Sequence, residues 1–272
     1  MLYHTLAQPK ISFMKITFKI CTTLLVLGFL SCKKEDTSPE PEPEPVKTAG
    51  AIRIEFNNIV GDSALVFNKK YLNPRGDTFS VTKFNYYISN ISVTMEDNTV
   101  YTEPESYHVI KHSATAPSLL LQNVPAGAYK SIKFTVGVDS ARNCSGAQTG
   151  GLDPAGAASD MYWSWNTGYI FLKLEGTSSR SASNEFVYHI GGYGGTNKTQ
   201  RGFNISFGAG RLNVTAAATP KVVLKTDVNE ILKSPTTIDF AAMPAVMNAG
   251  ADAKLMADNY SDMISIKSII NP

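Results

Sequence analysis

The segment DMYWSWNTGYIFLKLEG, from Asp160 to Gly176, is the most aromatic strand-like run of the chain. It carries both tryptophans of the chain, one residue apart. Successive side chains of an extended strand point to opposite faces, so Met161, Trp163 and Trp165 are expected on one side. Aromatic enrichment of this kind is also typical of an ordinary core strand in a β protein. The pattern therefore predicts a strand and does not by itself predict a function.

Short runs of strand-forming residues, separated by Gly, Pro, Asn and Asp, recur along the rest of the chain. They cover residues 52–56, 80–95, 107–110, 118–121, 130–138, 163–174, 185–190, 203–207 and 221–224. This spacing predicts an all-β fold, an antiparallel Greek-key-like β-sandwich. Two short helices are expected near the C-terminus, one opening with the capping pattern Asp227-Val228-Asn229-Glu230 and one over residues 254–260.

Residues 1–32 read as an N-terminal extension followed by a lipoprotein signal peptide. A basic segment from Met14 to Lys19 precedes an apolar run that ends at Leu30 and is too short to span a membrane. The small residue Ser31 then stands directly before Cys32, which is the bacterial lipobox pattern and makes Cys32 the predicted lipidation site. The alternative is an ordinary cleaved signal peptide that contains a cysteine.

Residues 33–50 read as a tether rich in Pro and Glu. Lys33-Lys34-Glu35-Asp36 resembles the export signal after the lipidated cysteine in surface lipoproteins of Bacteroidetes-like bacteria. Alternating Pro and Glu then favour an extended spacer of about 3.1 Å per residue. We expect an outer-membrane lipoprotein, facing the periplasm or the cell surface, whose residues 51–272 form one β domain.

Composition argues against several function classes. The formal charge of the whole chain is +2, and the first 32 residues carry lysines but no acidic residue, so the mature chain is close to neutral. A near-neutral chain lacks the basic surface that binds nucleic acid. The sequence contains no phosphate-binding glycine motif, no HExxH and no nucleophile elbow, and we predict that the protein is not an enzyme.

Hard oxygen ligands gather in one loop region, where a calcium ion is one hypothesis. They are Asp139, Asn143, Asp153 and Asp160. Their spacing is not that of an EF-hand, and ordinary turn chemistry explains these residue types equally well.

Several motifs occur in an order that resembles the MbnP-like domain. They are Gly137-Val138-Asp139-Ser140 with Asn143, Leu152-Asp153-Pro154, Met161-Tyr162-Trp163-Ser164-Trp165 with Gly168-Tyr169, and Tyr188-His189-Ile190-Gly191. That family is named for a copper-binding protein of methanobactin systems and is related to MopE-type surface copper proteins. The resemblance runs from about Ala51 to the C-terminus and implies a copper-binding lipoprotein for copper acquisition or buffering.

The resemblance also implies a set of copper ligands. The first set is Met161, Trp163, Trp165 and His189, and the lower-ranked set is His108, His112 and Cys144. Thioether, thiolate and imidazole groups suit Cu(I). A lone strand histidine or a lone thiol is, on the residues alone, more often structural. Residues 157–160 stand where the family has a glycine-containing turn, which leaves the geometry of the loop open.

In copper-binding members of the family a tryptophan is oxidised to kynurenine, which implies a di-haem MauG-type partner enzyme. Trp163 and Trp165 are then the expected oxidation sites. The alternative is a cell-surface structural or interaction lipoprotein whose aromatic side chains bind a glycan or a protein without metal.

Overall fold

Strand β4 (Thr78–Met95) is the centre of the larger of two sheets. One edge of β4 pairs with β11 (Leu172–Thr177) and then β8 (Gly127–Val136), and the other edge pairs with β3 (Lys70–Leu72), β6 (Tyr107–Lys111) and β5 (Val100–Thr102). Beyond β11 lie β12 (Glu185–Ile190) and β16 (Ala245–Val246), and β13 (Arg201–Ser206) and β14 (Leu212–Val214) pair with β8. Asn90 has φ +54°, and the pairing register of β4 and β8 shifts beside it. Asn is one of the few residues besides Gly that adopt this conformation readily.

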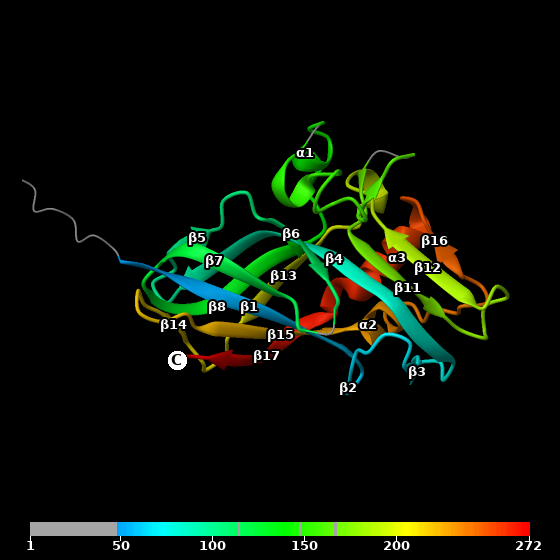
Figure 1. Cartoon of the computed structure of the whole chain (residues 1–272), viewed down its shortest axis with the longest axis horizontal. Helices are drawn as coiled ribbons and strands as arrows, with labels where there is room; N and C mark the ends of the chain where they lie inside the picture. Colours follow the sequence, from blue (N-terminus) through cyan, green and yellow to red (C-terminus); the bar gives the residue numbers. More distant parts are fainter. Residues whose placement is uncertain (1–47, 114, 147, 166–167) are drawn as a thin grey trace, which may run out of the picture. The chain divides into compact units, whose positions relative to one another are not determined.

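The computed structural model describes residues 48–272, apart from 114, 147 and 166–167 (Figure 1). The predicted signal peptide, the predicted lipidation site Cys32 and most of the predicted tether lie outside the described residues. Residues 46–272 group into one compact unit.

The smaller sheet is built around β1 (Ala49–Val60). It also contains β2 (Ser63–Ala64), β7 (Ser118–Pro125), β15 (Lys221–Asp227) and β17 (Ile264–Ile270). Along β1, Ile52, Ile54 and Phe56 are buried and alternate with half-buried residues, which is the pattern of a strand that covers a core. Within the described residues, β1 with β15 and β12 with β16 are parallel pairs, and the other pairs are antiparallel.

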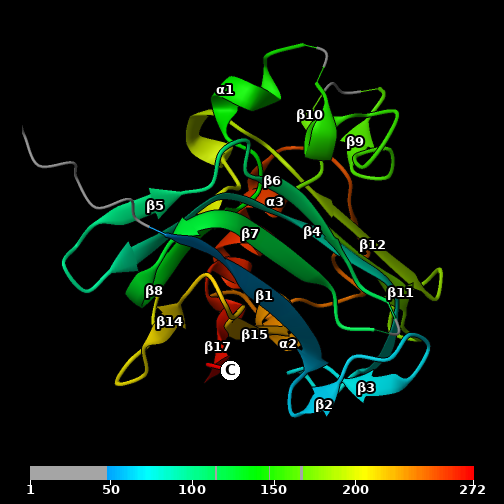
Figure 2. The ribbon, with the colours of Figure 1, turned by 60° about the vertical axis from the view of Figure 1, so that its left-hand side comes forward.

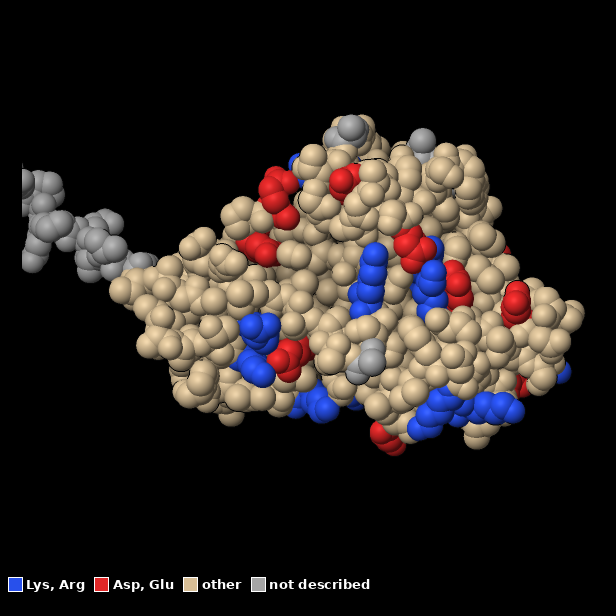
Figure 3. All heavy atoms as spheres, in the orientation of Figure 1, with Lys and Arg blue, Asp and Glu red and all other residues tan. Residues whose placement is uncertain are grey.

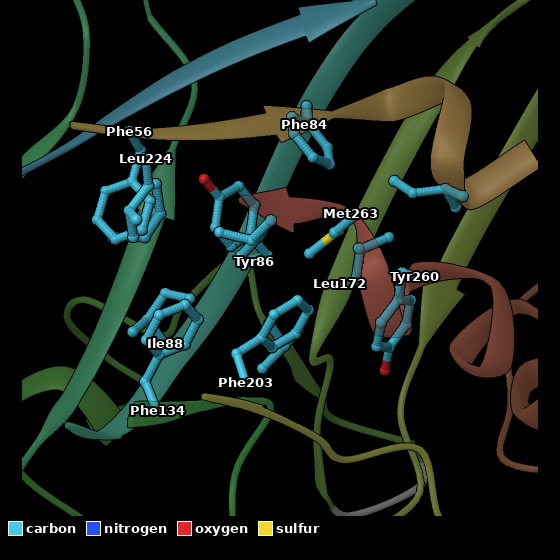
Figure 4. Close-up of a cluster of buried hydrophobic side chains, with 14 of the residues drawn as sticks. Phe56, Phe84, Tyr86, Ile88, Phe134, Leu172, Phe203, Leu224, Tyr260 and Met263 are labelled. Carbon is cyan, nitrogen blue, oxygen red and sulfur yellow. The ribbon is translucent and has the colours of Figure 1, made fainter. Parts of the chain in front are cut away.

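The core lies between the two sheets and is rich in aromatic rings (Figure 4). Phe56 and Leu224 reach it from the smaller sheet, and Phe84, Tyr86 and Ile88 reach it from β4. All five are at most 1% exposed. Fully burying an apolar side chain of this size stabilises the fold by about 1.5–3 kcal/mol. The predicted β-sandwich is confirmed.

Both helices predicted near the C-terminus are present, as α2 (Val228–Lys233) and α3 (Ala251–Asn259). Asp227 caps α2, because its Oδ1 accepts a hydrogen bond from the backbone N–H of Asn229 at 2.9 Å. A 3-10 turn, η3 (Tyr260–Asp262), connects α3 to β17. Among the described residues, no helix combines the length and apolarity that a membrane span requires.

Residues 138–171 cover the face of the larger sheet that points away from the smaller sheet, and we call them the covering segment (Figure 2). It contains α1 (Ser140–Asn143), the 3-10 turn η1 (Gly150–Leu152), β9 (Tyr162–Trp163) and β10 (Gly168–Tyr169). Tyr87 of β4 is buried beneath it and donates a hydrogen bond to the backbone oxygen of Gly151 at 3.1 Å. A second, smaller apolar cluster therefore lies outside the sandwich.

The single strand predicted over residues 163–174 is wrong, because the chain there forms β9, a turn, β10 and β11. Gly168 has φ +148°, a conformation that side-chain-bearing residues rarely adopt. The chain leaves the covering segment after this position and enters the larger sheet at Leu172.

Candidate functional site

Met161 and Trp163 pack in the same buried apolar cluster, whereas Trp165 lies outside it, so the three side chains do not line up on one side as predicted. Met161 is fully buried and Trp163 is 5% exposed, whereas Trp165 is 64% exposed. The prediction is wrong because β9 has only two residues and a turn follows it, so the two-residue alternation stops at Trp163. The two indole rings remain in contact, with centroids 5.9 Å apart and planes inclined at 49°.

Trp163 packs against Gly191, just after β12. A Cβ atom at position 191 would lie 2.7 Å from Cη2 of Trp163 and 2.5 Å from the backbone oxygen of Tyr169, so only glycine fits there. Ile190 is fully buried on the core side, which places the missing side chain of Gly191 on the opposite face. His189 lies on that same outer face, because it alternates with the buried Tyr188 and Ile190 along β12.

The imidazole of His189 is largely buried and pairs with a carboxylate. Its Nε2 lies 2.8 Å from Oε1 of Glu175 on the neighbouring strand β11, and 14% of its side chain is exposed. Burial lowers the pKa of His189 below its usual value, although the hydrogen bond that its ring donates to the Glu175 carboxylate acts in the opposite direction. A lowered pKa keeps the ring neutral at neutral pH, which is the form that binds metals.

Asp160 is held by side chains of two adjacent strands. Its carboxylate accepts hydrogen bonds from Nζ of Lys173 at 2.8 Å, Nζ of Lys83 at 3.3 Å and Nδ2 of Asn85 at 3.1 Å. Partial burial by itself would raise the pKa of Asp160, but the hydrogen bonds and charges of the two lysines outweigh it and lower this pKa. Figure 3 shows basic and acidic side chains next to one another over β4 and β11.

A pocket of about 370 Å³ adjoins Trp163. Asn143, Tyr169, Tyr193 and the glycine-rich loop after β12, which leads into the 3-10 turn η2 (Gly195–Asn197), also line it. Two buried nitrogens, Nε1 of Trp163 and Nδ2 of Asn143, find no hydrogen-bond partner among the described residues. Buried N–H groups without a partner are uncommon in folded proteins, and both of these residues line the pocket.

The other oxygen ligands of the calcium hypothesis serve local structure. Asp139 caps α1 and accepts a hydrogen bond from the Tyr107 hydroxyl at 2.5 Å. Asn143 accepts from the backbone N–H of Tyr169 at 3.1 Å, and Asp153 accepts from that of Ala155 at 2.9 Å. In the described ranges, no three His, Cys, Asp or Glu side chains gather in a way that could hold a metal ion.

The lower-ranked candidates have separate surroundings. His108 pairs through Nε2 with Glu103 at 2.8 Å. His112 lies 3.2 Å from the side chain of Asn58 and packs edge-on against Phe67, and burial lowers its pKa. Cys144 is exposed at the end of α1.

Sequence reasoning missed the partners that surround His189 and Asp160. They are Lys83, Asn85, Lys173 and Glu175. A signal for two of them existed, because Lys173 and Glu175 alternate with the buried Leu172 and Leu174 along β11. Nothing in the sequence shows which residues of β4 and β12 lie opposite them.

Comparison with known proteins places the fold and the motifs in one family. The family model MbnP matches residues 49–248, and this family is associated with copper. MbnP from Methylosinus trichosporium is similar in structure, with a TM-score of 0.48 and 11% identity, over 76% of this chain and 82% of that chain. No curated protein matches the chain. Since the family model spans most of its length, this chain belongs to the MbnP family.

Proposed function

We propose that this chain is a lipid-anchored, extracytoplasmic copper-binding protein that serves copper acquisition or buffering and catalyses no reaction. Copper is its cargo, held on the outer face of the larger sheet by His189, Met161 and an oxidised Trp163. The copper association of the family supports the metal. The lipobox pattern at Cys32 and the Pro/Glu-rich tether support an outer-membrane anchor facing the periplasm or the cell surface.

The observation that carries the proposal is the position of Trp163 relative to β12. Its ring edge rests on Gly191, two residues beyond His189, on the face that His189 occupies. Trp163 of the covering segment and His189 of β12 are both candidate ligands that the family resemblance implies. They therefore lie over the same end of β12.

The chemistry of these side chains fits copper. A histidine that donates one ring N–H to a carboxylate presents its other nitrogen as a ligand, and Glu175 takes the Nε2 side of His189. The thioether of Met161 suits Cu(I). An intact indole is a poor ligand. Oxidative cleavage of the C2–C3 bond of Trp163 by dioxygen or peroxide, followed by hydrolysis that releases C2 as formate, would give kynurenine, in which the unpartnered ring nitrogen has become an aromatic amine beside a new carbonyl. A di-haem MauG-type partner enzyme supplies that oxidation in this proposal.

Trp163 is the proposed oxidation site in preference to Trp165. Trp163 is 5% exposed and lies beside Gly191, whereas Trp165 is 64% exposed. The unmodified chain is expected to bind copper weakly, because the described residues supply no cluster of three His, Cys, Asp or Glu.

Two measurements test the proposal. The first is the intact mass and copper content of the mature protein from its native host. We expect a gain of roughly 4 Da on the peptide that carries Trp163, since kynurenine replaces one ring carbon by oxygen, and about one copper per chain. An unmodified mass without copper, also after anaerobic addition of Cu(I), would refute it.

The second measurement compares H189Q with H112Q in a Cu(I) competition titration of the native-host protein. His112 is also partly buried, but it packs against Phe67 and Asn58 instead of lying on β12. H189Q should weaken copper binding by at least about tenfold, while H112Q should bind like the wild type. Equal affinities of the two variants would contradict the role of His189.

A second function has one observation in its favour. Trp165 and Tyr193 are 64% and 40% exposed, and exposed aromatic side chains suit a surface that binds a glycan or a protein. A native protein that lacks both the oxidation and the copper would favour this interaction role.

A further inference from the structure

We infer that Asp160 is a positioning and charge-balancing residue of the copper site and not a metal ligand. This inference rests on the proposed function. Asp160 directly precedes Met161 and stands three residues before Trp163, so its position determines where both side chains begin.

The contacts of Asp160 attach the covering segment to the larger sheet. Lys83 and Asn85 reach its carboxylate from β4, and Lys173 reaches it from β11. A backbone contact also holds the next residue, because the carbonyl oxygen of Met161 accepts a hydrogen bond from the N–H of Ile170 at 2.8 Å, shortly before the chain enters β11. Three donors already occupy three of the about four acceptor positions of the carboxylate, which leaves little room for a metal ion at Asp160.

The charge of Asp160 matters because of Lys173. The side chain of Lys173 is only 8% exposed, and Lys173 is paired in register with His189 across β11 and β12. A nearly buried ammonium without a counter-charge repels a copper cation bound beside that histidine far more strongly than an exposed one would. Asp160 supplies the counter-charge at 2.8 Å.

Two lysines and two carboxylates then balance at this site. Lys83 and Lys173 face Asp160, and Glu175 faces His189. Removing the charge of Asp160 leaves a net positive charge next to the copper position. Removing the charge of Lys173 as well leaves one positive charge, on Lys83, and one negative charge, on Glu175, so the site is neutral again.

The test compares D160N, D160N/K173M and D153N in the native-host protein, with Cu(I) as the probe. Asp153 lies in the same loop, and its side chain accepts a hydrogen bond from the backbone N–H of Ala155. The side-chain oxygen of asparagine can accept the same hydrogen bond, so D153N is the matched control. We expect D160N to bind Cu(I) about 10–100-fold more weakly and D153N to bind normally. In the D160N background, K173M should recover the part of the loss that comes from the uncompensated charge, but not the part that comes from lost positioning. Thermal unfolding checks that every variant is folded.

Normal copper affinity in D160N, or an equal loss in D160N/K173M, would overturn the inference. A metal-free readout separates its failure from that of the proposed function. This readout uses unmodified protein from a host without the di-haem partner enzyme, in which Trp163 keeps its indole ring. In a W165F background of that protein, Trp163 fluorescence should be quenched more strongly by acrylamide in D160N than in D153N, whether or not the native protein binds copper. Unchanged quenching in D160N would show that Asp160 does not position the segment.

Discussion

Replacing Gly191 by alanine tests the contact on which the proposed site depends. The added Cβ would lie 2.5 Å from the backbone oxygen of Tyr169 and 2.7 Å from Cη2 of Trp163. Overpacking of this kind costs about 1–3 kcal/mol, and we expect about 2 kcal/mol because a backbone atom of β10 cannot rotate away. For a domain of this size that corresponds to a fall in Tm of about 4–8 °C.

Gly194→Ala is the matched control in the same loop. No heavy atom outside its immediate neighbours lies within 4 Å of the Cβ position there, so its Tm should stay close to that of the wild type. Thermal unfolding by circular dichroism measures both variants. In a W165F background, the fluorescence of Trp163 should shift to the red in G191A alone, because displacement of the ring exposes it. Equal Tm values and emission maxima for G191A and G194A would show that Trp163 does not rest on Gly191.

Two further predictions concern the fold. Asn259 is fully buried; its side chain donates hydrogen bonds to the backbone oxygens of Ile231 and Thr236 and accepts one from the N–H of Thr236. N259A should therefore lower the free energy of unfolding by about 3 kcal/mol. A loss of less than about 1 kcal/mol in urea denaturation would contradict this. Burial lowers the pKa of His112 and of His189 in the folded state. Just below the usual histidine pKa, the unfolded chain therefore binds more protons than the folded chain does. The free energy of unfolding should rise as the pH increases over about pH 5–7. The urea concentration at the midpoint of unfolding measures this rise with pH, and the double variant H112Q/H189Q should make the rise smaller. An unchanged pH dependence of the midpoint in the double variant would contradict the prediction.

The hydrophobic pattern predicted most of the sandwich. The runs at 80–95, 107–110 and 185–190 correspond closely to β4, β6 and β12. β12 alternates in burial, because one of its faces lies on the core, whereas residues 84–89 of β4 are buried on both faces and were recognised by their strand-forming residue types. The pattern missed β17 and the parallel pairing of β1 with β15. Pairing between distant strands depends on how their faces pack, and neither strand records it locally.

Alternation of polarity is a local property of each strand, so the sequence alone predicted the β-sandwich class. Met161, Trp163 and His189 became candidate ligands through the family resemblance, and their role in copper binding stays a prediction. Only the tertiary structure decided that Trp163 is buried and Trp165 exposed, that Trp163 rests on Gly191, and that Asp160 is held by Lys83 and Lys173. The physical reason is that burial and ion pairing arise from segments brought together by strand register, and a single-residue change of register would turn each of these side chains to the other face.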